Sequence, residues 1–302
     1  MKKTAILAVL TFLMGALQAQ VPQVSSGKIV RIHDFPSQYI HSRNIDVWLP
    51  DGYTDSLKYA VVYMHDGQML YDSTVTWNKQ EWQVDEVLSE LICKKKVQPC
   101  IVVGVWNNDG YRHTEYFPQR PLSVLPDSLR ATITDSWLKG KPLADNYLRF
   151  VVEELKPYID KHFSTLVDQD HTFLAGSSMG GLISMYGICE YPEVFGGAAC
   201  LSTHWIGTFE QNDEIPQAFN AYLSKHLPDP EDHRLYFDYG TATLDSLYEK
   251  HQLMIDKTME IRGYDQTNWS TLKFEGDDHS ERAWANRLHI PFTFLLQEPK
   301  TK

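Results

Sequence analysis

The feature that most constrains the fold is the segment 176–181 (GSSMGG), which stands between an apolar run and a helical pattern. The run 172–175 predicts a strand, and the residues after the segment repeat at the spacing of one helix face. A G-x-S-x-G turn in this setting puts its serine at the apex, and its glycines allow the backbone to crowd there. Ser178 is therefore the candidate nucleophile, and the N–H of Met179 should point at the atom that Ser178 attacks.

Apolar runs recur along the rest of the chain. Those at 59–64 (YAVVYM) and 100–105 (CIVVGV) are typical of strands buried on both faces of a parallel sheet. Alternating segments at 28–32 and 45–49 predict two opening antiparallel strands. Further strands are expected at 197–201, 235–239 and 271–274, and helices at 84–92, 145–162 (with a kink at Pro157) and 281–296. The alternation predicts one α/β domain, with a mostly parallel sheet and helices on both faces.

The segment 106–143 is the exception, since it is aromatic, contains several prolines and has little periodicity. Long irregular loops in compact domains usually carry function, so we expect a lid-like insertion that binds substrate. The alternative is an insertion packed on the surface without a role. Trp106, Arg112 and Tyr116 in this segment, with Trp205 after a later strand, are the candidate substrate-binding residues.

The first 19 residues are typical of a secretory signal peptide, with a basic start, an apolar stretch and a small residue, Ala19, at the expected cleavage point. The catalytic domain then spans residues 20–302, and we expect it to be periplasmic or secreted. The formal charge is −11, and no cluster of Lys and Arg forms a stripe that could follow a phosphate backbone, so nucleic acids and membrane insertion are not expected.

The four cysteines permit disulfides in an exported protein without requiring them. Cys93 and Cys100 flank a short connection and make the preferred pair, whereas Cys189 and Cys200 fit apolar faces as buried thiols. No Cys/His spacing is typical of zinc. We therefore expect neither a metal nor a cofactor.

A serine nucleophile needs a base and an orienting acid. His279 is the candidate base, because it follows the last expected strand and comes after the serine in the chain. The acid should follow the strand 235–239, where Asp238 lies within the strand and Asp245 lies beyond it. We favour Asp245, since a residue on the loop can reach His279, and Asp238 remains the alternative.

An oxyanion formed at Ser178 needs two N–H donors. Met179 supplies one, and the loop after the strand 59–64 should supply the other, from Gln68 or Met69. Gly67 lets that backbone come close. His65 and Asp66 are interpreted as side chains that brace this loop.

Several motifs together resemble the putative-esterase family of α/β-hydrolases. This family includes esterase D, enterochelin esterases, and the feruloyl and acetylxylan esterases of carbohydrate esterase family one. The matching segments are 150–159 (FVVEELKPYI), 172–202 with AGSSMGGL, 276–288 with His279 and Trp284, and 103–118, so the resemblance runs from about Val30 to Leu296. One departure concerns the acid, since many relatives place it three residues after the glycine that ends the penultimate strand. That position is Thr243 here.

The resemblance implies an α/β-hydrolase fold, Ser178 and His279 as nucleophile and base, and carboxylic esters as substrates. Export and the aromatic insertion favour feruloyl- or acetyl-type esters on carbohydrate. The alternatives are a siderophore trilactone esterase of the enterochelin type, an acyltransferase of the mycolyltransferase type, and a binding protein that kept the fold without catalysis.

Overall fold

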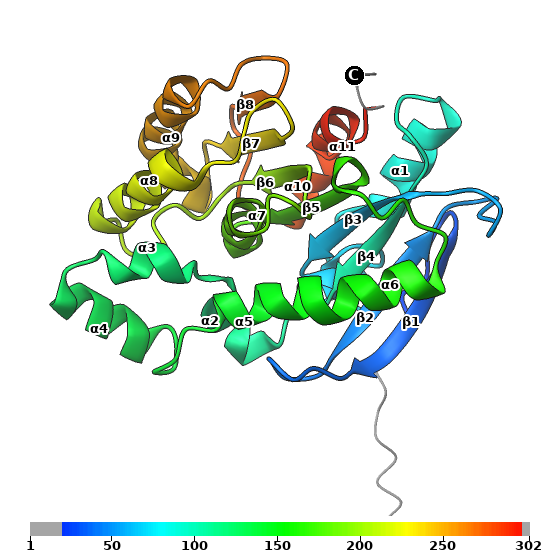
Figure 1. Cartoon of the computed structure of the whole chain (residues 1–302), viewed down its shortest axis with the longest axis horizontal. Helices are drawn as coiled ribbons and strands as arrows, with labels where there is room; N and C mark the ends of the chain where they lie inside the picture. Colours follow the sequence, from blue (N-terminus) through cyan, green and yellow to red (C-terminus); the bar gives the residue numbers. More distant parts are fainter. Residues whose placement is uncertain (1–19, 298–302) are drawn as a thin grey trace, which may run out of the picture.

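A computed structural model of the chain describes residues 20–297. The expected signal peptide, residues 1–19, lies outside the described residues. The described chain forms an eight-stranded sheet in the order β1-β2-β4-β3-β5-β6-β7-β8 (Figure 1). The strands are β1 Lys28–Phe35, β2 Arg43–Leu49, β3 Ala60–His65, β4 Cys100–Val105, β5 Thr172–Ser177, β6 Gly197–Leu201, β7 Arg234–Gly240 and β8 Trp269–Phe274.

The opening strands pair antiparallel and the rest of the sheet is parallel. β1 pairs with β2 and β2 with β4 in antiparallel fashion, whereas β3 to β8 run in the same direction. The central strands are buried along their whole length, because both of their faces are covered. This arrangement confirms the predicted mostly parallel sheet.

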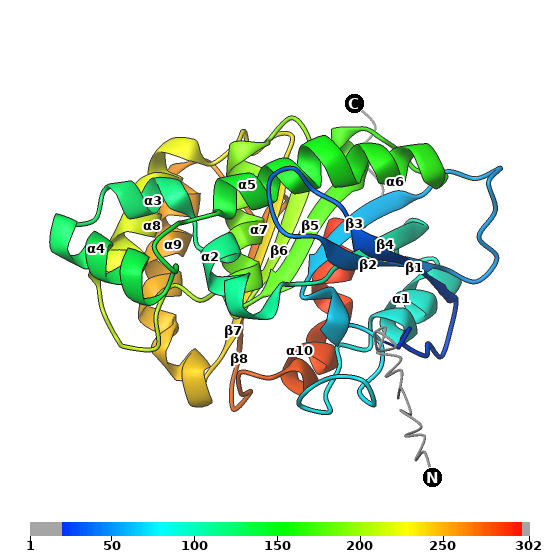
Figure 2. The same cartoon turned by 90° about the horizontal axis from the view of Figure 1, so that it is seen from below.

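Helices cover both faces of the sheet, and side chains of each strand alternate between two apolar cores. Val61 and Tyr63 on β3 join one core, and Val62 and Met64 join the other. Figure 2 shows α5, α6 and α7 on one side of the strands and α1 and α10 on the other. The helices of the first layer are α5 Ala144–Arg149, α6 Lys156–His162, α7 Met179–Glu190, α8 Glu214–His226 and α9 Glu249–Ile261. Those of the second are α1 Val84–Cys93, α10 Glu281–Arg287 and α11 His289–Leu295.

Two predicted helices differ in detail from the structure. The predicted helix 281–296 divides into α10 and α11, because Pro291 has no N–H to donate to the carbonyl of Arg287 and its ring crowds that turn. The predicted helix 145–162 runs from α5 to α6 through a π-helical stretch, Phe150–Leu155, which lies just before Pro157. Prolines are therefore associated with both departures.

The insertion 106–143 is helical rather than irregular, which corrects the prediction. It forms a 3-10 turn Asp109–Tyr111 and the helices α2 Arg112–Tyr116, α3 Gln119–Ser123 and α4 Asp127–Ser136. Pro118 and Pro126 stand at the N-caps of α3 and α4, where a missing N–H costs nothing. Such short helices depend on burial, which here involves Phe117, Leu122 and Ile133 and packs α3 against α8.

All four cysteines are free thiols in the structure, so the preferred Cys93–Cys100 disulfide is not formed. Cys93 is exposed at the end of α1 whereas Cys100 is buried in β4. Cys189 and Cys200 are buried, as expected from their apolar faces. Between residues 20 and 297 no helix has both the length and the apolar character needed to cross a membrane.

Candidate active site

The turn that carries Ser178 joins β5 to α7 at the carboxyl edge of the parallel strands. Ser178 adopts φ 57° and ψ −120°, which is a strained conformation for a residue with a side chain. A Cβ at Gly176 would lie 2.8 Å from the carbonyl carbon of Gly180, so only glycine permits this close approach. Met179 is the first residue of α7, and its N–H has no acceptor within that helix. The turn therefore offers a hydroxyl and an N–H together.

His279 and Asp245 meet at the same edge, after β8 and β7. The Nδ1 atom of His279 lies 2.5 Å from Oδ1 of Asp245. Asp245 belongs to a 3-10 turn, Thr243–Leu247, that begins soon after β7 ends. Thr243 occupies the position where many relatives carry the acid, and here its Oγ1 accepts the backbone N–H of His279 at 2.9 Å. One turn thus holds both the side chain and the backbone of His279.

The carboxylate of Asp245 is fully buried but well supplied with donors. Its Oδ2 accepts hydrogen bonds from the Ser202 hydroxyl and the Gly240 N–H, both at 2.6 Å. Burial raises the pKa of Asp245, but the hydrogen bond and charge of His279 and the bonds from Ser202 and Gly240 outweigh it. The pKa is lowered overall. Asp245 is therefore held as the anion that a protonated imidazole needs as partner.

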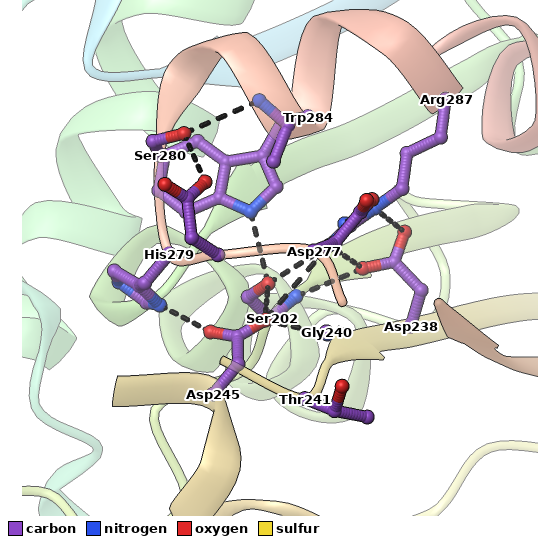
Figure 3. Close-up of polar contacts among 12 residues, drawn as sticks. Ser202, Asp238, Gly240, Thr241, Asp245, Asp277, His279, Ser280, Trp284 and Arg287 are labelled. Atoms are coloured by element: carbon purple, nitrogen blue, oxygen red, sulfur yellow. Dashed lines mark hydrogen bonds and ion pairs between the residues drawn. The ribbon is translucent and has the colours of Figure 1, made fainter. Parts of the chain in front are cut away.

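Asp238, the alternative acid, lies within β7 and binds Arg287 instead of His279. Its carboxylate binds Arg287, with Nη2 2.9 Å from Oδ1 (Figure 3). It also accepts the Tyr236 hydroxyl at 3.1 Å. Asp238 and Tyr236 are two residues apart, so their side chains share one face of the strand. Asp245, beyond the strand, is the carboxylate that reaches His279.

The loop after β3 forms a 3-10 turn, Gly67–Met69, that faces Ser178 across the site. A Cβ at Gly67 would lie 2.4 Å from the carbonyl carbon of Gly104 on the neighbouring strand, so glycine is required there as well. The Met69 N–H already donates to the Asp66 carbonyl at 2.9 Å. Of the two predicted donors, Gln68 is therefore the one left for an oxyanion.

Asp66 and His65 connect this loop to the insertion and to α5. Arg112 binds Asp66 through two parallel hydrogen bonds of 2.7 Å, and the Asn107 amide adds a third at 2.7 Å. His65 is buried, and its Nδ1 lies 2.7 Å from the Tyr147 hydroxyl. Burial lowers the pKa of His65 to about 4, so this imidazole is neutral at ordinary pH. These contacts fit the bracing role expected for the two side chains.

A cavity of about 810 Å³ contains Ser178 and His279 in its lining. Polar side chains and four Trp or Phe rings line it, and two of these rings are largely exposed at the rim, Trp77 at 83% and Phe209 at 61%. The other lining residues, from several loops at this edge, are Asp66, Gln68, Met69, Asn78, Gln80, Trp82, Asn107, Asp109, Arg112, His113, Ser177, Met179, His204, Leu244, Ser280, Glu281 and Trp284. The candidate groups thus share one substrate-sized space.

Arg112 is the one predicted substrate-binding residue that lines this cavity. Trp106 lies outside it, because its indole N–H donates to Asp46 at 2.8 Å and its ring packs against Arg31. Tyr116 is buried, with its ring against those of His65 and Tyr147.

Trp205 is also buried, and its indole N–H donates to Gln252 at 2.8 Å. The prediction of substrate contact is therefore wrong for Trp106, Tyr116 and Trp205, whose aromatic surfaces pack inside the protein. Three other aromatic residues that line the cavity, Trp77, Trp82 and Phe209, were not among the candidates.

The structure adds a tyrosine and a histidine near Ser178 that the sequence reasoning missed. The Tyr248 hydroxyl lies 2.7 Å from Nδ1 of His204 and also interacts with the Ser178 side chain. Burial lowers the pKa of His204 well below its usual range, and the nearby His279, His113 and Arg112 add to this. Tyr248 stands three residues after Asp245, a spacing typical of one helical turn, which is the signal that could have indicated it.

Metal chemistry has no candidate ligand set in the part of the chain that is described. Residues 20–297 contain no group of three or more His, Cys, Asp or Glu side chains placed to hold an ion. A hydroxyl (Ser178) and an imidazole (His279) line the cavity instead, and a buried carboxylate (Asp245) contacts the imidazole from behind. This set suits acyl transfer through a serine.

Solved structures with the same fold include esterases. A ferulic acid esterase superposes with a TM-score of 0.64 at 19% identity, covering 89% of this chain and 97% of that one. The enterobactin esterase FES from Shigella flexneri superposes with a TM-score of 0.64 at 17% identity, covering 91% of this chain and 60% of that one. The feruloyl esterase module from Clostridium thermocellum superposes with a TM-score of 0.63 at 16% identity, covering 93% of both chains. At these identities the likeness shows the α/β-hydrolase fold.

Two curated proteins have sequences related to this chain, at 24% and 26% identity. YbbA of Bacillus subtilis, which is uncharacterized, is 24% identical over 166 residues, covering 54% of this chain and 58% of the relative. An endo-1,4-beta-xylanase/feruloyl esterase of Xylanibacter ruminicola is 26% identical over 190 residues, covering 59% of this chain. This chain spans 22% of that longer protein.

The family model described as "Putative esterase" matches residues 37–291. This range contains both sides of the cavity, with the Ser178 turn, Asp245 and His279. The chain therefore belongs to the Putative esterase family, a family of carboxylic ester hydrolases.

Proposed function

We propose that this chain is an exported serine esterase that hydrolyses feruloyl- or acetyl-type esters on carbohydrate. His279 takes the proton of the Ser178 hydroxyl while Oγ attacks the ester carbonyl. The tetrahedral oxyanion is held by the N–H groups of Met179 and Gln68. His279 then gives its proton to the leaving alcohol, and water, activated by the same imidazole, releases the acid from the acyl-serine.

The observation that carries this proposal is the 2.5 Å contact between His279 and a buried carboxylate, beside a cavity that also contains the strained Ser178 turn. A base held by a fixed anion can accept the serine proton without losing its orientation. The lowered pKa of Asp245, where donors outweigh the effect of burial, supports the same role.

The shape and charge of the cavity support the proposed substrate class. Trp77 and Phe209 offer flat apolar surfaces at the rim, which suit a feruloyl ring or a sugar ring. Arg112 lines the cavity, but its guanidinium is already paired with Asp66. A strongly anionic siderophore trilactone would therefore find little free positive charge, and we rank it second.

Replacing Ser178 by alanine tests the mechanism. Hydrolysis of a short p-nitrophenyl ester by Ser178→Ala should fall by at least about 10³-fold, because no other hydroxyl takes part. Ser164→Ala, which removes a buried hydroxyl that donates to the Asp55 carbonyl, is the matched control and should retain its rate. A fluorophosphonate should label the wild type and not Ser178→Ala. Unchanged hydrolysis by Ser178→Ala would rule out the mechanism.

A panel of esters tests the substrate. Methyl ferulate and acetylated xylan should have higher kcat/KM than a catecholate trilactone. A trilactone preference would refute the carbohydrate assignment and leave the esterase mechanism intact. Product analysis with an added sugar alcohol distinguishes hydrolysis from acyl transfer, since an acyltransferase would yield the new ester instead of the free acid.

A further inference from the structure

Ser202 stands at the end of β6, behind the carboxylate of Asp245, and takes no part in the chemistry described above. It is fully buried and adopts φ 40°, in the left-handed region. Non-glycine residues in that region commonly mark sites where backbone strain is tolerated for function. Figure 3 shows its hydroxyl among the side chains of Asp245, Trp284 and Arg287.

The direction of the Ser202 proton follows from its partners. The indole Nε1 of Trp284 lies 2.9 Å from the Ser202 oxygen, and Nη2 of Arg287 lies 3.0 Å from it. Indole and guanidinium groups can only donate, so Ser202 accepts from both. Its single proton is then directed to Oδ2 of Asp245, 2.6 Å away. The hydroxyl thus connects two donors to one carboxylate.

Arg287 is itself held in place. Its guanidinium binds Asp238 through Nη2 at 2.9 Å and Asp277 through Nη1 at 2.8 Å, and its side chain is only 2% exposed. Nη2 remains 4.0 Å from Oδ2 of Asp245, beyond hydrogen-bonding distance. The charge of Arg287 acts on Asp245 across this distance, but the hydrogen bonding between the two side chains runs through the Ser202 hydroxyl.

Two donors occupy Oδ2 of Asp245, and His279 contacts Oδ1. The Gly240 N–H and the Ser202 hydroxyl both lie 2.6 Å from Oδ2. With Oδ2 fixed, the carboxylate cannot turn about its axis without breaking these bonds, so Oδ1 stays directed at the imidazole. Trp284 adds a second link, since the edge contact of its ring with that of His279 has a centroid distance of 5.0 Å.

We propose that Ser202 is a positioning residue for the ester-hydrolysing site, which relays hydrogen bonding from Arg287 and Trp284 to Asp245 and so fixes the carboxylate against His279. The proposal rests on the proposed function, in which Asp245 orients the base. It extends the site to a side chain that contacts none of the reacting atoms.

Ser202→Ala tests the relay against the control Ser164→Ala. Without the hydroxyl, Asp245 is less well oriented and becomes a stronger acceptor, which favours the protonated base. We expect kcat/KM to fall about 10- to 100-fold, the range for one hydrogen bond to a charged group, with KM nearly unchanged. The acid limb of the kcat/KM profile should move to higher pH. Ser164→Ala should change neither.

A spectroscopic measurement reports on the site without any substrate. The proton between Asp245 and His279 should give a far-downfield ¹H NMR resonance, assigned by its loss in Asp245→Asn. Ser202→Ala should shift or broaden it, and Ser164→Ala should leave it in place. If Ser202 only supports the fold, thermal stability falls while the resonance and the pH profile stay as in the wild type, and the proposal is overturned.

The double variant Ser202→Ala/Asp245→Asn distinguishes action through Asp245 from direct action. If Ser202 acts through the carboxylate, its loss should change kcat/KM less than about threefold in the Asp245→Asn background. An equal loss in both backgrounds would overturn the relay. A wild type that hydrolyses no ester but shows the expected resonance changes would refute the proposed function and leave the relay standing.

Discussion

Two carboxylates lie on opposite sides of Ser178 along the sheet, Asp66 after β3 and Asp245 after β7. Each has an arginine nearby, but the arrangement differs. Arg112 binds Asp66 directly through two hydrogen bonds of 2.7 Å. Arg287 stays 4.0 Å from Asp245, and the Ser202 hydroxyl joins the two.

The difference separates a carboxylate that supports a loop, Asp66, from a carboxylate that orients the proposed base, Asp245. The guanidinium of Arg112 keeps its charge, and the pKa of Asp66 is lowered, so near neutral pH this pair holds the Gln68 loop without gaining or losing a proton. Asp245 instead offers one oxygen to His279, the residue type that changes charge near neutral pH. A direct arginine contact on Oδ1 would compete with that imidazole, and an indirect one through Ser202 does not.

Asp245→Asn should give the largest effect of the comparison. The amide keeps the shape but can donate a proton toward Nδ1, which favours the wrong imidazole tautomer and removes the anion. We expect kcat to fall about 10⁴-fold with little change in KM. Asp238→Asn, which alters a carboxylate bound to Arg287 instead of His279, is the matched comparison and should cost far less. Steady-state kinetics on an aryl ester measure both. If kcat fell equally in both variants, Asp245 would not be distinguished from Asp238 as the acid that orients His279.

Local patterns explain why much of the site could be predicted. The strand, glycines and helix around Ser178 lie within one short segment, so periodicity and turn chemistry indicate its geometry. The choice of Asp245 over Asp238 depends on which residue lies beyond the strand, and that can be inferred from the end of an apolar run. In both cases the information is contained in neighbouring residues.

Contacts between segments that are distant in the sequence explain why other parts of the site and fold could not be predicted. Ser202 and Arg287 are 85 positions apart, and no pattern around either residue indicates that they meet. Trp106 was expected in the cavity because aromatic residues in a long insertion suggest binding, but Asp46 and Arg31 from the opening strands hold it elsewhere. The short helices α2 and α3 escaped prediction because their stability comes from packing, of α2 against α5 and α7 and of α3 against α8, rather than from propensity.

Arg112→Lys should give an intermediate effect, because it tests the fixed support alone. Lysine keeps the charge but cannot form the two parallel bonds to Asp66, so the Gln68 loop loses its exact register. We expect kcat/KM to fall roughly 10- to 100-fold, less than the 10²–10³-fold typical of losing a whole oxyanion donor. Arg130→Lys, in the exposed ion pair with Asp127 on α4, is the control and should have no effect. An unchanged rate for Arg112→Lys would show that the loop needs no such brace.

Asp66→Asn should give the smallest effect, on stability and its dependence on pH. The pKa of Asp66 is lowered: burial acts to raise it, but the charge and hydrogen bonds of Arg112 and the bond from Asn107 outweigh this. A lowered pKa in the folded state means that the ionised carboxylate stabilises the fold above its usual value of 3.8, and that this contribution is lost as pH falls through the lowered pKa.

The wild type should therefore exceed Asp66→Asn in free energy of unfolding by about 1 kcal/mol at neutral pH, with the gap closing at acid pH. Urea unfolding at several pH values measures the gap, and Asp127→Asn, a surface pair, controls for loss of charge alone. A gap that is constant down to strongly acid pH would mean that Asp66 supports the loop by its shape and not by its charge. The contrast with Asp245 would then rest on the partner of each carboxylate rather than on its ionisation.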